Sequence, residues 1–170
     1  LQGDWSSDVC SSDLGDTDVY EAYPPADAKI VLRGRVLSGM KPSDGPASYQ
    51  KKRASDKQDQ DVNTPMMPVA WTREHQNENG KVNRVLCTTM GSATDLQSEG
   101  LRRLVVNSVF WGLGMKVPSK ANVDFVDPFQ PTMYGFGGYK KGTRPADYGL
   151  GAKPKPQASA APLKLNNEIG

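Results

Sequence analysis

Residues 67–115 read MPVAWTREHQNENGKVNRVLCTTMGSATDLQSEGLRRLVVNSVFWGLGM, and this stretch decides the fold. Residues 67–74 and 81–89 form two apolar runs, and a polar turn that ends in Gly80 separates them. This spacing predicts an antiparallel hairpin with a longer loop. Pro68 stands at the start of its strand, where a missing backbone donor is tolerated.

Residues 101–115 predict an α-helix because their apolar side chains recur at helical spacing and cover a wide face. Ser98 is suited to cap the amino-terminal end, and the helix dipole favours Glu99 in the first turn. Gly114 is expected just beyond the last turn, and Pro118 follows soon after it.

Upstream of the hairpin, the sequence is less regular. We predict strands over residues 18–23 and 29–37, with a bulge at Gly34. Residues 41–65 hold almost no apolar side chains, so they cannot bury enough surface to offset the entropy of ordering, and we expect a loop. A basic cluster in this loop could contact phosphate or nucleic acid, although a solvated surface is the favoured interpretation; it consists of Lys51, Lys52 and Arg53.

Both ends of the chain resemble translated sequencing-library adapter. Residues 5–14 read WSSDVCSSDL, and residues 168–170 match the start of the same adapter on the opposite strand. We therefore expect residues 1–14 and 168–170 to be foreign, and we exclude them from fold reasoning. Their exclusion removes four of the 19 acidic residues and none of the 21 basic ones, which leaves a net charge of +6. Cys87 is then the single remaining cysteine, so no disulfide is predicted.

Four successive blocks carry a family resemblance: MPVAWTRE, GKVNRVLCTTMGSATDL, SEGLRRLVVNSVFWGLGM and VPSKANVDFVDPFQPTMYGFGGYKKG. Their order and spacing resemble the carboxy-terminal half of ThuA-like domains, the trehalose-utilisation family with a class I glutamine-amidotransferase-like fold. The upstream pieces TDVYEAY and VLSGMKP are similar to the same family. The resemblance covers roughly residues 15–148.

This resemblance implies an α/β fold with a flavodoxin-like, doubly wound sheet, to which the antiparallel hairpin and an extended carboxy-terminal arm would belong. The sheet would be incomplete, because the opening βαβ units of such a domain would precede Gly15. We expect the domain over residues 15–150, followed by a linker over residues 151–167, which are rich in Ala, Pro and Lys. The chain would thus be a fragment of a larger bacterial protein with further domains on either side.

The cysteine and histidine of a working glutamine amidotransferase cannot be placed in this chain. Cys87 lies inside a strand pattern without flanking glycines, which favours a small buried side chain. His75, the one histidine, lies near the polar turn. Ser92 stands where many ThuA-like proteins have a histidine, and serine cannot act as a general base near neutral pH. The sequence therefore leaves enzymatic activity open.

The loop that follows the second hairpin strand is the candidate ligand site, because ligands in open α/β sheets bind beyond the carboxyl ends of strands. The polar side chains of this loop could bind a polyol: Thr89, Ser92, Thr94 and Asp95. Asp18, at the start of an upstream strand, could face the same crevice. A structural alternative is favoured for the loop, since Thr94 and Gln97 also match a helix capping box. For Asp18, the structural alternative is that its side chain forms a turn.

No metal or cofactor is expected, because the sequence has one histidine, one credible cysteine and no clustered carboxylates. No apolar run approaches the ~20 residues that cross a membrane. The basic, aromatic arm over residues 127–150 is expected to pack on its own domain and not to bind nucleic acid. Its anchors would be Phe129, Tyr134, Phe136 and Tyr139.

Two functions from different classes follow. One is a sugar-related enzyme domain that serves the utilisation of trehalose or a similar glycoside. The other is a non-catalytic module that binds carbohydrate or another protein. The serine at position 92 and the linker-like tail favour the module, whereas the family resemblance favours the enzyme.

Overall fold

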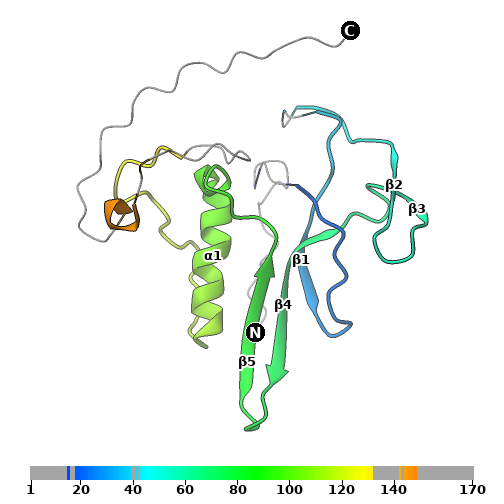
Figure 1. Cartoon of the computed structure of the whole chain (residues 1–170). Coiled ribbons are helices and arrows are strands. Elements are labelled where there is room, and N and C mark those ends of the chain that lie inside the picture. The colour runs from blue at the N-terminus through cyan, green and yellow to red at the C-terminus, as the bar shows by residue number, and fades with distance from the viewer. Residues whose placement is uncertain are drawn as a thin grey trace. The chain divides into compact units, whose positions relative to one another are not determined.

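The computed structural model describes residues 15, 18–39, 41, 43–131, 142 and 144–148 (Figure 1). It divides the chain into two units, Leu1–Tyr134 and Gly135–Gly170. The described part of the second unit holds one 3-10 helix, η2 (Pro145–Tyr148), in which the Asp147 carboxylate accepts a hydrogen bond from the Arg144 N–H at 2.9 Å. All other elements belong to the first unit. The predicted adapter segments, the linker and three of the four predicted anchors lie outside the described residues.

The predicted hairpin is confirmed by strands β4 (Pro68–Gln76) and β5 (Val82–Thr88), which pair antiparallel. Asn77 shapes the turn, because its side-chain oxygen accepts hydrogen bonds from the N–H groups of Asn79 and Lys81 at 3.0 and 2.9 Å. Gly80 takes a φ of +75°, which glycine adopts without steric cost. The hairpin is buried at its Pro68 end and exposed at its turn.

The predicted helix is also confirmed, as α1 (Glu99–Gly112), which begins directly after the predicted cap Ser98 and ends three residues before Met115. The Ser98 hydroxyl accepts a hydrogen bond from the Leu101 N–H at 3.3 Å, as expected of the N-cap. Gly114 has a φ of +71° beyond the last turn, and its N–H bonds to the Trp111 carbonyl. This left-handed glycine ends the helix.

The hydrophobic core lies between α1 and the central strand β4. Leu101 and Ala70 are fully buried, and Leu104 is nearly so. Alternation along the strands directs Thr88, Leu86 and Arg84 of β5 to the same face as Ala70. Arg84 accordingly reaches α1, where its guanidinium stacks over Trp111 and donates to the Trp111 carbonyl at 2.8 Å.

Strand β1 (Lys29–Arg33) pairs with the opposite edge of β4, in the order β1-β4-β5. It ends earlier than the predicted strand over residues 29–37, and its register shifts occur around Leu32 and not at Gly34. A side chain at Gly34 would lie only 2.6 Å from Val69 and 2.7 Å from Val19, so glycine permits this close packing. The prediction of a strand over residues 18–23 is wrong, because this segment is irregular.

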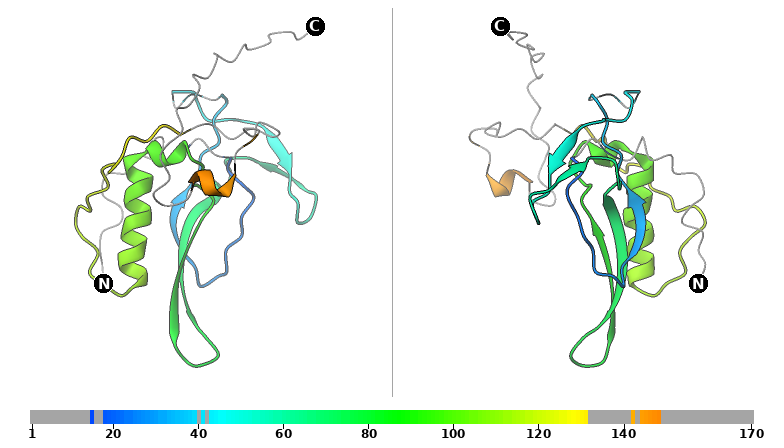
Figure 2. Two further views of the ribbon diagram at one scale, coloured as in Figure 1. Left: turned by 60° about the vertical axis from the view of Figure 1, so that its left-hand side comes forward. Right: turned by 90° about the vertical axis from the view of Figure 1, so that its right-hand side faces the viewer.

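The expected loop over residues 41–65 contains a small two-stranded antiparallel sheet, β2 (Gln50–Lys52) and β3 (Asp59–Asp61). Its side chains are polar, so backbone pairing and charged contacts stabilise this small sheet, and apolar burial does not. Figures 1 and 2 show this sheet and α1 on opposite sides of the three-stranded sheet. The hydrophobic pattern could not reveal it, because neither strand has a buried face.

The doubly wound, flavodoxin-like sheet is contradicted. Every paired strand in the described residues is antiparallel, and α1 is the one α-helix among them. A doubly wound fold needs parallel strands joined by crossover helices on both faces of the sheet. Here a tight hairpin joins β4 to β5, which leaves no room for such a crossover.

We predict that Leu101→Ala lowers the free energy of unfolding by about 2–5 kcal/mol, because it opens a cavity in the small core. Val109→Ala is the matched control in the same helix, since that side chain is 56% exposed. Chemical denaturation of both variants tests this placement of the core. Equal costs for the two substitutions would contradict it.

Candidate functional site

An open cavity of about 620 Å³ is the candidate site. It lies among three parts of the first unit: the segment around residues 18–21, the loop over residues 35–41 and the β2–β3 sheet. Two tyrosines in its wall, Tyr20 and Tyr49, are about half exposed. Charged side chains of both signs complete the wall: Asp18, Glu21, Arg35, Lys41, Lys51, Lys52, Arg53 and Asp61.

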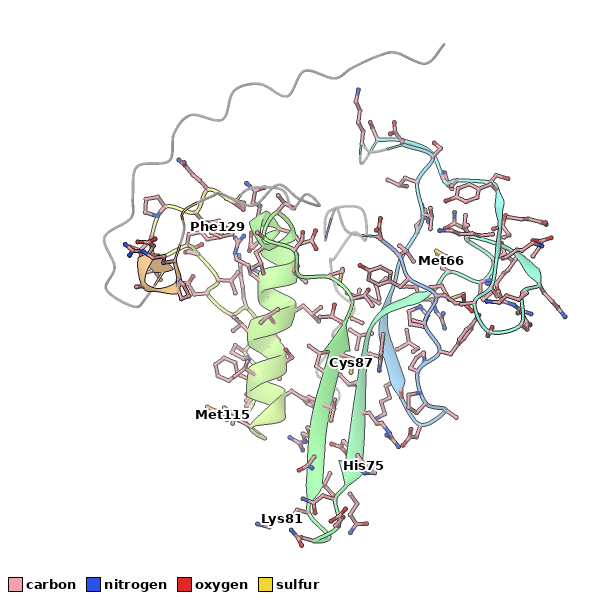
Figure 3. All side chains as sticks on the ribbon, in the orientation of Figure 1. Met66, His75, Lys81, Cys87, Met115 and Phe129 are labelled. Atoms are coloured by element: carbon pink, nitrogen blue, oxygen red, sulfur yellow. The ribbon has the colours of Figure 1, made fainter. Side chains whose placement is uncertain are left out.

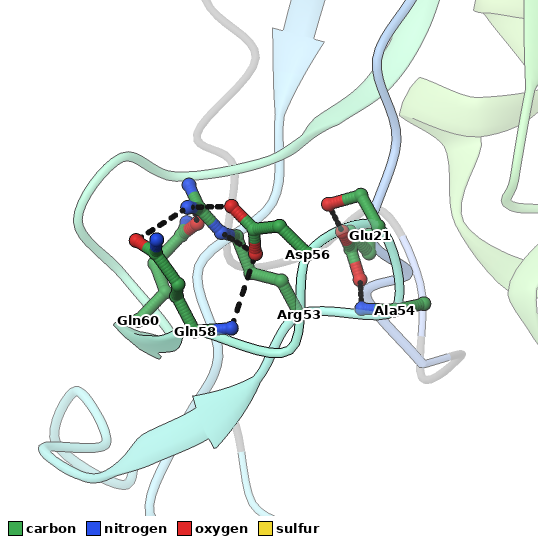
Figure 4. Close-up of polar contacts among 7 residues, drawn as sticks. Glu21, Arg53, Ala54, Asp56, Gln58 and Gln60 are labelled. Carbon is green, nitrogen blue, oxygen red and sulfur yellow. Dashed lines mark hydrogen bonds and ion pairs between the residues drawn. The ribbon is translucent and has the colours of Figure 1, made fainter.

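Glu21 joins the first of these parts to the turn of the small sheet (Figure 4). Its carboxylate accepts hydrogen bonds from the Ala54 N–H at 2.6 Å and from the Ser55 hydroxyl at 3.1 Å. The Ala54 N–H is the main reason that the pKa of Glu21 lies below its ordinary value. Tyr23 lies nearby, and its pKa is raised by desolvation and then by its hydrogen bond to Glu21.

Arg53 organises the turn between β2 and β3. Its guanidinium forms an ion pair with Asp56 and also donates to the Gln58 and Gln60 side chains at 3.3 and 3.4 Å (Figure 4). The hydrogen bond between Arg53 and Asp56 raises the pKa of the arginine and lowers the pKa of the aspartate. In β2 itself, Lys52 pairs with Asp59 across the sheet at 3.0 Å.

Asn63 fixes the loop over residues 35–41 to the segment before Tyr49. Its side-chain oxygen accepts from the Val36 N–H at 2.8 Å, and its amide nitrogen donates to the carbonyls of Val36 and Ala47, both at 2.9 Å. A backbone bond from the Val62 N–H to the Tyr49 carbonyl, at 3.2 Å, closes the same wall. These bonds hold the cavity wall where few apolar side chains are buried.

Asp18 is the one predicted ligand residue that lines the cavity. The other four predicted residues lie in the loop after β5, where most of their polar groups bond to one another. The Asp95 carboxylate accepts from the N–H groups of Gly91 and Ser92 at 2.9 and 3.0 Å. The Ser92 hydroxyl lies 3.1 Å from the Thr94 hydroxyl and accepts from the Asp95 N–H at 3.3 Å.

The predicted capping box at Thr94 does not form. Thr94 is the N-cap of the short 3-10 helix η1 (Asp95–Gln97), but its side chain makes no capping hydrogen bond. Asp95, which is only 2% exposed, satisfies the backbone of this turn instead. The Thr89 hydroxyl is buried and has no hydrogen-bond partner among the described residues. The loop is therefore a self-contained turn that Asp95 holds, and not the capping box that the structural alternative predicts.

One residue links this turn to the cavity. A side chain added at Gly15 would lie 3.0 Å from the Asp95 carboxylate, and Gly15 itself lines the cavity. Asp95 thus lies close to Gly15, and a side chain at position 15 would crowd its carboxylate.

Cys87 and His75 lie on the same face of the hairpin but far apart (Figure 3). Cys87 pairs with Trp71, and His75 pairs with Asn83. The two pairs are four residue steps apart along the strands, which is about 13 Å at about 3.3 Å per step. A nucleophile and its base must be within hydrogen-bond reach, so these two side chains do not form a catalytic pair.

Among the described residues, no group of three or more His, Cys, Asp or Glu side chains could hold a metal ion. No helix in the same residues is both long and apolar enough to cross a bilayer. Comparison with family models, with curated proteins and with solved structures finds no match for this chain.

Sequence reasoning missed most of the site. The sequence predicts a strand around Tyr20 and another that contains Arg35, so it singles out neither side chain as a binding residue. The basic cluster that begins at Lys51 was noticed and then assigned to a solvated loop. The available signal was Tyr49 placed just before this cluster, an aromatic side chain beside several cations in an otherwise polar stretch.

We predict that Glu21→Gln lowers the melting temperature at pH 7 but has no effect in strong acid. A carboxyl group whose pKa is lower in the folded state stabilises the protein above its unfolded pKa, here near 4.5. That stabilisation is lost as the pH falls through the lowered folded pKa. Thermal melts across this range check the prediction, with Glu78→Gln in the exposed hairpin turn as control. A difference that persists unchanged in strong acid would contradict it.

We also predict that Asp95→Ala destabilises the chain by about 1–3 kcal/mol, because two backbone N–H groups lose a buried acceptor. Thr94→Ala removes only the contact with the Ser92 hydroxyl and should cost less. Denaturation curves compare the two variants. A larger cost for Thr94→Ala would show that the turn is held differently.

Proposed function

We propose that this chain binds carbohydrate without transforming it. The observation that carries this proposal is the cavity, in which Tyr20 and Tyr49 stand beside polar groups that can both donate and accept hydrogen bonds. Its volume of about 620 Å³ falls within the range of about 300–1,000 Å³ that is common for small-molecule sites.

The chemistry of the wall suits a sugar. A pyranose ring has an apolar face of C–H groups, which can lie on an aromatic ring because the face of that ring is electron-rich. Its rim carries hydroxyl groups, each of which donates one hydrogen bond and accepts two. Asp18 offers acceptors for such hydroxyls, and Arg35 and Lys51 offer donors. The resemblance to ThuA-like domains adds trehalose, a neutral disaccharide, as the first ligand to test.

The lack of a catalytic pair supports the binding role over the enzymatic one. Cys87 and His75 are too far apart to act together, and neither lines the cavity. The loop that was expected to contribute to an active site uses Ser92, Thr94 and Asp95 in its own turn. The cysteine and the histidine that the structure describes are therefore not aligned as a nucleophile and its base.

We predict that the 170-residue chain binds trehalose or a similar disaccharide in isothermal titration calorimetry and releases it unchanged. Tyr49→Ala should weaken this binding about threefold to tenfold, because the loss of an aromatic contact costs about 0.5–1.5 kcal/mol. His75→Ala, on the hairpin and outside the cavity, should leave the affinity unchanged.

Two results would contradict the proposal. One is an affinity that does not respond to Tyr49→Ala. The other is the appearance of glucose or a modified sugar when the disaccharide is incubated with the chain and followed by NMR.

A further inference from the structure

The β2–β3 sheet is attached to the rest of the first unit at two places, its base and its turn. None of its residues, 50–61, is buried, and neither strand packs on another helix or strand of the described residues (Figure 1). At the base, the Asn63 side chain bonds to two other backbone segments. At the turn, the Glu21 carboxylate accepts from the Ala54 N–H and the Ser55 hydroxyl (Figure 4).

The other polar contacts of the turn stay within the small sheet. The Arg53 N–H bonds to the Gln58 carbonyl at 2.9 Å, and the Lys57 ammonium bonds to the Ala54 carbonyl at 2.9 Å. Tyr23 reaches the turn as well, but it belongs to the same segment as Glu21. Among the described residues, polar contacts from residues 21–23 are thus what ties this turn to the rest of the unit.

The segment that carries Glu21 is itself fixed to the three-stranded sheet. Before Glu21, Val19 packs so closely on Gly34 that an added side chain there would lie 2.7 Å from it. After Glu21, Asp27 forms an ion pair with Arg73 of β4 at 2.9 Å. If the contacts of Glu21 break, the β2–β3 sheet therefore keeps only its base, and it is the part that can move.

This contact also closes one side of the cavity, because Glu21 and Ala54 both belong to its wall. We infer that residues 50–61 form a flap of the cavity, that the flap turns about the base held by Asn63, and that the Glu21 carboxylate is the latch that keeps it closed. This inference concerns access to the cavity and goes beyond the proposed function, since it does not depend on which ligand enters.

The charge of Glu21 strengthens the latch, because a hydrogen bond to an ionised acceptor is about twice as strong as a neutral one. Two titratable groups face this carboxylate: Tyr23 on its own segment and Arg53 on the turn, which is paired with Asp56. The Ala54 N–H holds the pKa of Glu21 below its ordinary value of 4.5, so the latch is charged at neutral pH. Acid also protonates Asp56, so substitutions at neutral pH separate the latch from the turn itself.

Hydrogen exchange of the 170-residue chain at pH 7, followed by NMR without any ligand, tests the latch. Glu21→Ala should speed exchange at the Ala54 N–H about tenfold, and Glu21→Gln, which keeps a neutral acceptor, about threefold. The Arg53 N–H, bonded inside the flap, and the Val36 N–H, bonded to Asn63 at 2.8 Å in the base, should keep their protection in both variants.

A distance measurement tests the movement itself. Spin labels at Lys57→Cys in the flap and Glu78→Cys in the hairpin turn, with serine in place of Cys10 and Cys87, should give a broader distance distribution when Glu21→Ala is added. Asp59→Asn is the matched control, because it removes the ion pair with Lys52 in the same sheet and leaves the latch intact. It should change neither the distances nor the exchange at Ala54.

The rate of ligand entry tests whether the flap controls access. Ser55 belongs to the latch but not to the cavity wall, so Ser55→Ala weakens the latch without removing a wall group. This variant should speed both the binding and the release of trehalose about twofold to threefold in stopped-flow fluorescence, since one neutral hydrogen bond is lost. If trehalose does not bind at all, the proposed function fails, and the exchange and distance measurements still decide this inference.

Three results would overturn the flap and leave carbohydrate binding untouched. One is unchanged protection of the Ala54 N–H in Glu21→Ala. Another is a simultaneous loss of protection at the Arg53 N–H, which would show that the small sheet unfolds and does not turn as a unit. The third is an unchanged distance distribution, which would show that the base alone holds the sheet in place.

Discussion

The contact of Leu101 and Leu104 in α1 with Ala70 in β4 is the constraint from which the first unit is built. It fixes the helix against the central strand, and β4 in turn positions both neighbours. The Val69 carbonyl accepts from the Thr89 N–H and from the Thr88 hydroxyl, both at 3.0 Å, so β5 ends in a defined place. On the other edge, the Gly34 N–H bonds to the Met67 carbonyl at 2.9 Å, which sets where the cavity loop begins.

The cavity lies beyond the reach of this core, and polar contacts define its walls. The carboxylate of Glu21 and the amide of Asn63 each bridge segments that are distant in sequence, whereas the guanidinium of Arg53 holds the turn between β2 and β3. Individual exposed hydrogen bonds and ion pairs contribute little net stability. The walls are consequently less strongly stabilised than the core.

The sequence predicts those elements whose side chains are buried on one face. The β4–β5 hairpin and α1 were found because Ala70, Leu101 and the capping Ser98 leave a periodic or positional signal. The β2–β3 sheet was not found, because its exposed strands QKK and DQD leave no hydrophobic pattern. The cavity shares this limit, since it depends on contacts such as Asn63 with Val36, which are 27 residues apart and have no local signature.

The failure to place the site at a strand end has a specific physical cause. The rule that ligands bind beyond the carboxyl ends of strands requires neighbouring parallel strands, whose ends and following loops then meet at one edge of the sheet. Here β4 runs antiparallel between β5 and β1, so the loop at Thr89 lies beside the beginning of β4, which separates it from the carboxyl end of β1 at the same edge. In that loop, the Asp95 carboxylate accepts from the backbone N–H groups of Gly91 and Ser92, and the Ser92 and Thr94 hydroxyls contact each other. The open space forms instead where irregular segments meet the small polar sheet, and charged side chains of both signs line it there.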